Sequence, residues 1–393
     1  MNARIRSLDY LRGLSILGIL LVNAITFAQP FDIYVLPRLS PVPLSHDDLI
    51  VWWLTETFFK EKFITGFTLL FGISLYLVGR DRDPAQPAYR RPLFRRLSWL
   101  LVFGLIHGAL IWHGDILLSY ALTGFVFWRW QDASARKLLI WGGLLFLAGE
   151  ALLLGPNIWH QLAGDVATET AADFGPLIAR MRGGFFDSLE QNAEVWAQGE
   201  FAEILGYMPT TLGLMMVGLG LFKAGILSGE ASTRTYMILM TVAAICLGLI
   251  GWQSYVIMKQ DFPFPQIFGL YAVANNLLCV PVALGYASAL ILLGRMRLGA
   301  WLLYPLACAG RMAFTNYLMQ SLIMTGLFYG GRGILGFGGW FGEMNHAALV
   351  PIVASIWIGQ LVLSTVWMSV FRYGPFEWGW RCLTYGRWMR LAK

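Results

Sequence analysis

Long apolar runs recur along the whole sequence and limit the folds that this chain can adopt. Each run has roughly the 17–25 residues that an α-helix needs to cross about 30 Å of hydrocarbon. Only 13% of the 393 residues are charged and 57% are hydrophobic, whereas a soluble protein has about 25% charged residues. We therefore predict an all-α, polytopic membrane protein, a single integral membrane domain of residues 1–393. Its ten predicted spans are 11–28, 62–79, 97–113, 115–130, 137–155, 204–222, 235–257, 272–293, 310–329 and 348–370.

The positions of Lys and Arg predict the orientation of the spans. If the N-terminus is cytoplasmic, basic residues in the inner segments outnumber those in the outer segments by about three to one, as the positive-inside rule requires. Both termini are then cytoplasmic. The net charge of +6 is accordingly a topology signal, and no nucleic-acid partner is expected. The four scattered cysteines have no metal-ligand spacing, so no metal is expected either.

Three segments outside the spans have recognisable patterns. Residues 29–61 begin as a Pro-rich loop and continue as a helix, for which Ser45 and Asp48 form a capping box. Residues 156–203 combine acidic side chains with scattered aromatic residues, which predicts a periplasmic helical insertion. The Trp-, Tyr- and Arg-rich tail, residues 371–393, is typical of an interfacial helix on the cytoplasmic leaflet, and an anchoring role is favoured over chemistry.

The stretch from Phe103 to Tyr120, FGLIHGALIWHGDILLSY, places polar groups where a membrane span should be apolar. Charged side chains at such depth cost about 2.5–3.5 kcal/mol and usually face a cavity or a partner. Gly114 and Asp115 are typical of a tight turn in which the aspartate caps the following helix. We therefore predict a working site at the outer mouth of this hairpin, built from Asn23, His107, His113, Asp115 and Tyr120.

Within that mouth, His107 is the preferred proton-transfer residue. It lies six residues before His113, which is roughly 9 Å along a helix, and histidine as a residue type titrates near neutrality. Asp115 would orient it. The alternative is that His107 bonds a neighbouring helix and Asp115 only caps. His46, in the first outer loop, is the second candidate base, although most of its neighbours are typical of a solvated face.

Two further groups of polar residues are candidates for binding. Asn316 and Gln320 are spaced i, i+4 and share a helix face, which indicates either substrate binding or hydrogen bonds between helices. On the inner side, basic residues form a rim that can hold phosphates or can be explained by topology alone; its members are Arg12, Arg95, Arg96 and Arg311.

The sequence resembles a known family. SLDYLRGLSILGILLVN, KFITGFTLLFGISL, GLIHGALIWHGDILLSYALTG, GRMAFTNYLMQSLI and FRYGPFEWGWRCLTYGR occur in this order in the YeiB family of bacterial inner-membrane proteins of unassigned function. That family is similar to the transmembrane acyltransferases typified by heparan-alpha-glucosaminide N-acetyltransferase. The shared residues lie in the first span and are Asp9, Arg12, Gly13 and Asn23.

The resemblance implies a function for the predicted site. Those enzymes carry a catalytic histidine about a dozen residues after the asparagine, whereas this chain has Tyr34 in that window, so His46 or His107 must replace it. An acyl group would pass from cytoplasmic acyl-CoA, the expected co-substrate, to an acceptor in or beyond the bacterial inner membrane. Asn23 would polarise the acyl carbonyl.

The expected partners are membrane lipids and an acceptor that is a small molecule, a lipid or a glycan. The sequence is also compatible with a homodimer. An alternative function is a transporter or lipid-binding membrane protein without catalysis, and a third is a scaffold whose outer cap binds a partner.

The charge distribution yields a direct test of topology. A reporter enzyme that is active only in the periplasm, fused after Lys393, should be inactive in cells, whereas a fluorescent protein fused there should fold and fluoresce. An active periplasmic reporter would contradict the assigned orientation.

Overall fold

The computed structural model of the protein describes all residues except 1–5, 79–89, 165–172, 264–266, 268 and 334–337. The described residues form helices, with one isolated bridge between Phe371 and Ala392 and no β-strand. The helices are α1 (Arg6–Ala28), α2 (Phe31–Val35), α3 (His46–Phe58), α4 (Lys62–Leu77), α5 (Arg90–Ile106), α6 (Leu117–Phe127), α7 (Ala135–Leu162), α8 (Gly175–Arg182), α9 (Phe185–Lys223), α10 (Thr233–Lys259), α11 (Leu270–Arg295), α12 (Arg297–Leu302), α13 (Tyr304–Arg311), α14 (Ala313–Phe328), α15 (His346–Val370) and α16 (Pro375–Tyr385). The prediction of an all-helical polytopic protein is confirmed.

A helix lies at each of the ten predicted spans. Among the described residues, six helices are long and apolar enough to cross a membrane: α1, α5 with the turn that follows it, α7, α10, α11 and α15. Helices α4 and α14 have 16 residues each and α6 has 11, which is shorter than a full crossing. Helix α9 instead has 39 residues, because the last part of the predicted insertion, from Phe185 onward, and the sixth span form one continuous helix. The number of ten crossings stays a prediction.

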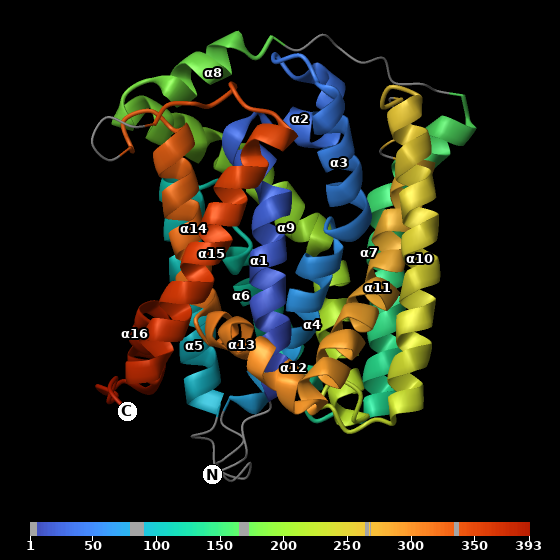
Figure 1. The fold of residues 1–393 in the computed structure, drawn as a ribbon, viewed down its shortest axis with the longest axis vertical. Helices are drawn as coiled ribbons and strands as arrows, with labels where there is room; N and C mark the ends of the chain where they lie inside the picture. Colours follow the sequence, from blue (N-terminus) through green and yellow to red (C-terminus); the bar gives the residue numbers. More distant parts are fainter. Residues whose placement is uncertain (1–5, 79–89, 165–172, 264–266, 268, 334–337) are drawn as a thin grey trace.

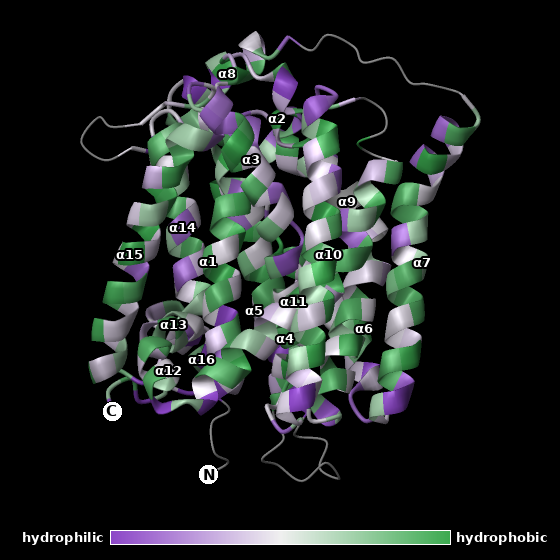
Figure 2. Cartoon of the chain, turned by 45° about the vertical axis from the view of Figure 1, so that its right-hand side comes forward, coloured by the Kyte–Doolittle hydropathy of each residue, from purple (hydrophilic) through white to green (hydrophobic). Residues whose placement is uncertain are grey.

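Helix α1 occupies the centre of the bundle (Figure 1). In the most apolar 18-residue stretch of α1, 72% of the residues are buried inside the protein, whereas the corresponding share is 28–39% in the other five candidate spans. It packs closely against α13, because a Cβ on Gly13 would lie 2.1 Å from the carbonyl oxygen of Leu306. The surrounding helices turn apolar faces outward, and hydrophilic residues gather at the two ends (Figure 2).

Different helices lie at the two ends of the bundle. Helix α1 begins at the end where α16 and the C-terminus lie, which we call the terminal end (Figure 1). Helices α2, α3 and α8 lie at the opposite end, the cap end. The predicted capping box is confirmed there: Ser45 Oγ accepts the N–H of Asp48 at 3.1 Å, and the Asp48 carboxylate accepts the N–H of Ser45 at 2.9 Å. Burial by itself would raise the pKa of Asp48, but hydrogen bonds from Ser45 and Ala347 leave it lowered.

The C-terminal tail is packed against the bundle. Helix α16 contacts α5 and α14, and the Nε1–H of Trp380 donates to the carbonyl oxygen of Arg96 at 3.0 Å. The Glu377 carboxylate accepts the backbone N–H groups of Phe314 and Thr315 at 2.7 and 3.0 Å. The first turn of a helix has N–H groups without an acceptor in the helix itself, and these are two of them. The tail therefore supplies hydrogen-bond acceptors to α14, in addition to any anchoring role.

Substitution of Glu377 tests this contact. Glu377→Ala leaves two backbone N–H groups without their acceptor, and we expect the free energy of unfolding to fall by about 1–3 kcal/mol. Glu377→Gln keeps an acceptor oxygen and should lose less. Thermal unfolding of the purified protein in detergent measures both, and an unchanged melting temperature for Glu377→Ala would refute the role.

Candidate functional site

The polar stretch at the end of α5 adopts a π-helical turn, His107–Ile111, in which the N–H of Trp112 donates to the carbonyl oxygen of His107 at 2.8 Å. Turns of this kind widen a helix by one residue and are frequent at functional sites. Gly108 is required here, because a Cβ would lie 2.2 Å from Nε1 of Trp196 on α9. The turn therefore needs the long helix α9 directly against it.

Partners from elsewhere in the chain satisfy the carbonyl groups of this turn. The Asn192 side-chain amide donates to the carbonyl oxygens of Gly108 and Ala109 at 2.9 and 3.1 Å, while its oxygen accepts the N–H of His113 at 2.8 Å. The Arg332 guanidinium donates to the carbonyl oxygens of Leu110 and Ile111 at 3.1 and 2.8 Å. Asn192 of α9 and Arg332, which follows α14, thus fix the turn that carries His107.

The turn directs His107 into a buried hydrogen-bonded array. Its Nδ1 lies 2.8 Å from Asp115 Oδ1, and its Nε2 lies 2.9 Å from Ser321 Oγ on α14. The second oxygen of Asp115 accepts the N–H of Leu118, in the first turn of α6, at 2.8 Å. The carboxylate therefore satisfies a donor of that turn as predicted, although the N-cap position itself is the next residue, Ile116. The exposed fractions of His107, Asp115 and Ser321 are 1, 6 and 1%.

The protonation pattern of the array follows from its members. A carboxylate only accepts, so the neutral imidazole carries its proton on Nδ1 and leaves Nε2 to accept the hydroxyl proton of Ser321. The order serine, histidine, aspartate is that of a nucleophile, its base and the group that orients the base. Sequence reasoning missed Ser321, and the only signal was its place directly after Gln320 in the polar stripe of α14.

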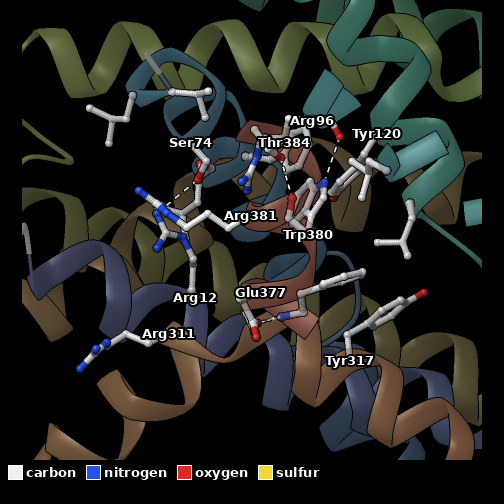
Figure 3. Close-up of a pocket in the computed structure, with 18 of the residues that line it drawn as sticks. Arg12, Ser74, Arg96, Tyr120, Arg311, Tyr317, Glu377, Trp380, Arg381 and Thr384 are labelled. Atoms are coloured by element: carbon white, nitrogen blue, oxygen red, sulfur yellow. Dashed lines mark hydrogen bonds between the residues drawn. The ribbon is translucent and has the colours of Figure 1, made fainter. Parts of the chain in front are cut away.

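A cavity of about 490 Å³, which we call the terminal cavity, is lined by residues of α1, α4, α5, α6, α13, α14, α16 and the chain after α16 (Figure 3). Arginines are prominent in its wall, and among the described residues that line it Glu377 is the only acid. Arg12 donates to Asp9 at 3.1 Å and to Ser74 at 3.2 Å. The basic residues of the wall are Arg12, Arg96, Arg311, Arg381 and Arg387.

The predicted rim is partly assembled in this cavity. Arg12, Arg96 and Arg381 lie together near Ser74, whereas Arg311 points away from them (Figure 3) and donates to the carbonyl oxygen of Arg372 at 2.9 Å. The guanidinium of Arg96 lies 3.6 Å from the ring centroid of Trp380. Arg95 is exposed and does not line the cavity. Arg381 and Arg387 were missed, because the tail was interpreted as an anchor.

A second cavity of about 290 Å³, the cap-side cavity, brings together three of the five predicted mouth residues: Asn23, Asp115 and Tyr120. Its other polar lining residues include Tyr34, Glu61, Ser119, Glu150, Tyr207 and Asn276. Burial, followed by the nearby Glu61 carboxylate, raises the pKa of Tyr34 well above its usual value. Tyr34 therefore stays protonated at neutral pH and is a hydrogen-bond donor rather than a base.

The two cavities meet inside the bundle. Ile116 and Tyr120 belong to both walls, and the Tyr120 hydroxyl is held by Thr68 Oγ1 at 2.5 Å. Asp115 lines the cap-side cavity and Tyr317 lines the terminal cavity. The ring of Tyr317 lies 5.0 Å from the ring of His107, centroid to centroid. The His107 array is therefore next to the partition between the cavities.

The remaining predicted residues lie away from this junction. His113 packs on Trp112, and His46 is the exposed first residue of α3; neither lines the two cavities. Asn316 donates to Ser364 Oγ at 3.1 Å, and Gln320 donates to Gln360 Oε1 at 2.8 Å. These bonds join α14 to α15, which is the arrangement expected of residues that hold helices together, and substrate contact for them stays a prediction.

The support of the π-helical turn can be tested with a matched pair of variants on α9. Asn192→Leu removes the donor to two buried carbonyl groups, at about 1–3 kcal/mol for each unpaired group. The melting temperature should fall and amide exchange at residues 107–111 should become faster. Gln198→Leu, at an exposed position, should change neither measurement. Equal behaviour of the two variants would contradict the role of Asn192.

Comparison with known proteins gives consistent relatives. A family model described as "Protein of unknown function (DUF418)" matches residues 221–387. Uncharacterized protein YeiB of Escherichia coli is 32% identical, over 96% of this chain and 95% of that protein. Uncharacterized protein YxaH of Bacillus subtilis is 30% identical, over 100% of this chain and 97% of that protein. An uncharacterized 39.9 kDa protein of Bacillus acidopullulyticus is 26% identical, over 98% of this chain and 95% of that protein.

Proposed function

The chain belongs to the YeiB family, and on that premise we propose that it is a transmembrane acyltransferase. It moves an acyl group from a phosphate-bearing thioester such as acyl-CoA, bound at the terminal end, to an acceptor bound at the cap end. In this proposal the membrane is the bacterial inner membrane and both termini are cytoplasmic, so the terminal end faces the cytoplasm.

The observation that carries the proposal is the meeting of the two cavities at Ile116 and Tyr120. Group transfer needs the reacting groups of donor and acceptor to reach the same catalytic residues. Two cavities that approach from different sides and share a wall supply such a meeting point. His107, fixed by Asp115, lies next to that wall and is the base that takes the acceptor's proton.

The terminal cavity has the composition of a donor site. Its arginines offer charge-assisted hydrogen bonds to phosphate groups, and its volume of about 490 Å³ is in the usual range of 300–1,000 Å³ for ligand sites. Trp380 and Tyr385 lie in the same wall, where the guanidinium groups of Arg96 and Arg381 lie 3.6 and 5.2 Å from their respective ring centroids. The ring of Tyr317 must move for the acyl end of the donor to reach His107.

The cap-side cavity has the composition of an acceptor site. Asn23 is in its wall and supplies an amide donor that can polarise the acyl carbonyl. The hydroxyls of Tyr34 and Tyr207, in the same wall, offer further hydrogen bonds to a polar acceptor. Its smaller volume suits a small molecule or the polar head of a lipid or glycan.

The same two-sided arrangement also favours a transporter that alternates between the cavities. Glu61 and Glu150 in the cap-side wall are ionisable groups of the kind that mark substrate pathways in membranes. Such a transporter would move its substrate without consuming a thioester. Consumption of acyl-CoA by the purified protein therefore separates the two functions. If the protein transports a substrate but consumes no acyl-CoA, acyl transfer is refuted.

Binding of coenzyme A to the purified protein tests the donor site with neighbouring residues of α5. Arg96→Ala removes a guanidinium from the cavity wall and should weaken binding about 10- to 150-fold, equivalent to about 1.5–3 kcal/mol for a bond to a charged group. Arg95→Ala, at an exposed position outside the wall, should bind like the wild type. Isothermal titration calorimetry measures both. Absence of binding to the wild type, or equal loss in the two variants, would overturn the assignment.

A further inference from the structure

Ser321 differs from three other serines that lie inside helices. Ser74, Ser288 and Ser355 each donate to the carbonyl oxygen four residues earlier, at 2.9, 2.7 and 2.8 Å, the usual way for a serine to satisfy its hydroxyl in a helix. For Ser321 the equivalent carbonyl, of Tyr317, lies at 3.3 Å, and His107 Nε2 is closer at 2.9 Å. Its hydroxyl is therefore turned toward the histidine.

We infer that Ser321 is the nucleophile of the site and carries the acyl group as an ester between donor and acceptor. The inference rests on the proposed acyl transfer. It adds a covalent step, because a serine hydroxyl becomes a competent nucleophile when a base lies within hydrogen-bond distance and a third group orients that base. His107 and Asp115 meet both conditions, at 2.9 and 2.8 Å.

The two half-reactions balance with the groups present. Ser321 Oγ attacks the thioester carbonyl carbon while its proton passes to His107 Nε2; the carbon–sulfur bond then breaks and the thiol leaves with that proton. In the second half, the hydroxyl or amine of the acceptor attacks the ester carbonyl carbon and gives its proton to His107. The bond to Oγ breaks and the proton returns to Ser321. Donor and acceptor are the only reactants.

The position of Ser321 suits a carrier between two sites. On α14 it lies one turn from Tyr317, which lines the terminal cavity, and its partner array ends at Asp115, which lines the cap-side cavity. With a covalent intermediate the thiol can leave before the acceptor binds. The partition at Tyr120, held by Thr68, then never has to open toward both sides at once.

Trp112, which packs near the array, is a candidate donor for the developing oxyanion. The ring of Trp112 is 6.3 Å from that of His107, centroid to centroid, and is 2% exposed. Its Nε1–H is buried without a hydrogen-bond partner among the described residues. Buried polar groups of this kind are rare in native structures, and the carbonyl oxygen of a bound acyl group would supply the acceptor.

The direct test is labelling of the purified, full-length protein with a fluorophosphonate probe, which reacts with activated serines. One equivalent should add to Ser321, located by mass spectrometry of the peptide. Ser321→Ala should lose the label, and His107→Ala should label at least about 100-fold more slowly. Ser288→Ala, a buried serine that bonds its own helix, should label like the wild type. Labelling at another residue, or none in folded wild-type protein, would overturn the inference.

Turnover of acyl-CoA separates this inference from the proposed function. Ser321→Cys should accumulate an acyl thioester that neutral hydroxylamine removes, which would support the carrier even if Ser321→Ala does not fold. If Ser321→Ala transfers acyl groups at the wild-type rate, transfer is direct and the carrier is refuted while the function stands. If the wild type consumes no acyl-CoA yet Ser321 takes the probe in a His107-dependent manner, the proposed function and the carrier role both fail, and only the activation of Ser321 by His107 is supported.

Discussion

A carboxylate inside an apolar bundle has to be paired, and much of the cap end is arranged to pair Asp115. One oxygen meets His107 Nδ1 at 2.8 Å and the other accepts the N–H of Leu118. The imidazole is presented by the π-helical turn, His107–Ile111, whose carbonyl groups then need donors of their own. Asn192 and Arg332 supply those donors. Helix α9 and Arg332 are therefore structural parts of the site.

The terminal end presents the opposite electrostatic problem. Several arginines share one cavity, and their like charges repel in a region where water is partly excluded. Glu377, the acid in that wall, already accepts two backbone N–H groups of α14. An anionic ligand would relieve this repulsion, and the folded tail closes around the cavity that would hold it. The terminal cavity, with its arginines, thus differs in charge from the cap-side cavity, whose wall contains Glu61 and Glu150.

Polar residues within one helix can have different roles, and only their partners separate them. Asn316 and Gln320 bond Ser364 and Gln360 of α15, so they hold helices together. Ser321, the next residue along, lies about 100° further around the helix and meets His107. A buried amide needs a partner in any membrane protein, whereas a serine whose hydroxyl lies closer to a histidine than to the carbonyl oxygen of its own helix points to chemistry.

The sequence by itself determined the helical fold, the position of a helix at each predicted span and the capping box at Ser45, because these depend on apolar length and on neighbours within one turn. It indicated the pairing of His107 with Asp115 as one of two alternatives, the other being a bond from His107 to a neighbouring helix, and the structure contains both contacts. Only the tertiary structure decided the rest. Ser321 is 214 residues from His107, and Arg381 reaches its cavity because the tail folds back. His113 and His46 lie away from the junction. The direction in which a turn or loop points its side chains is set by packing against the rest of the chain, and no local sequence pattern encodes it.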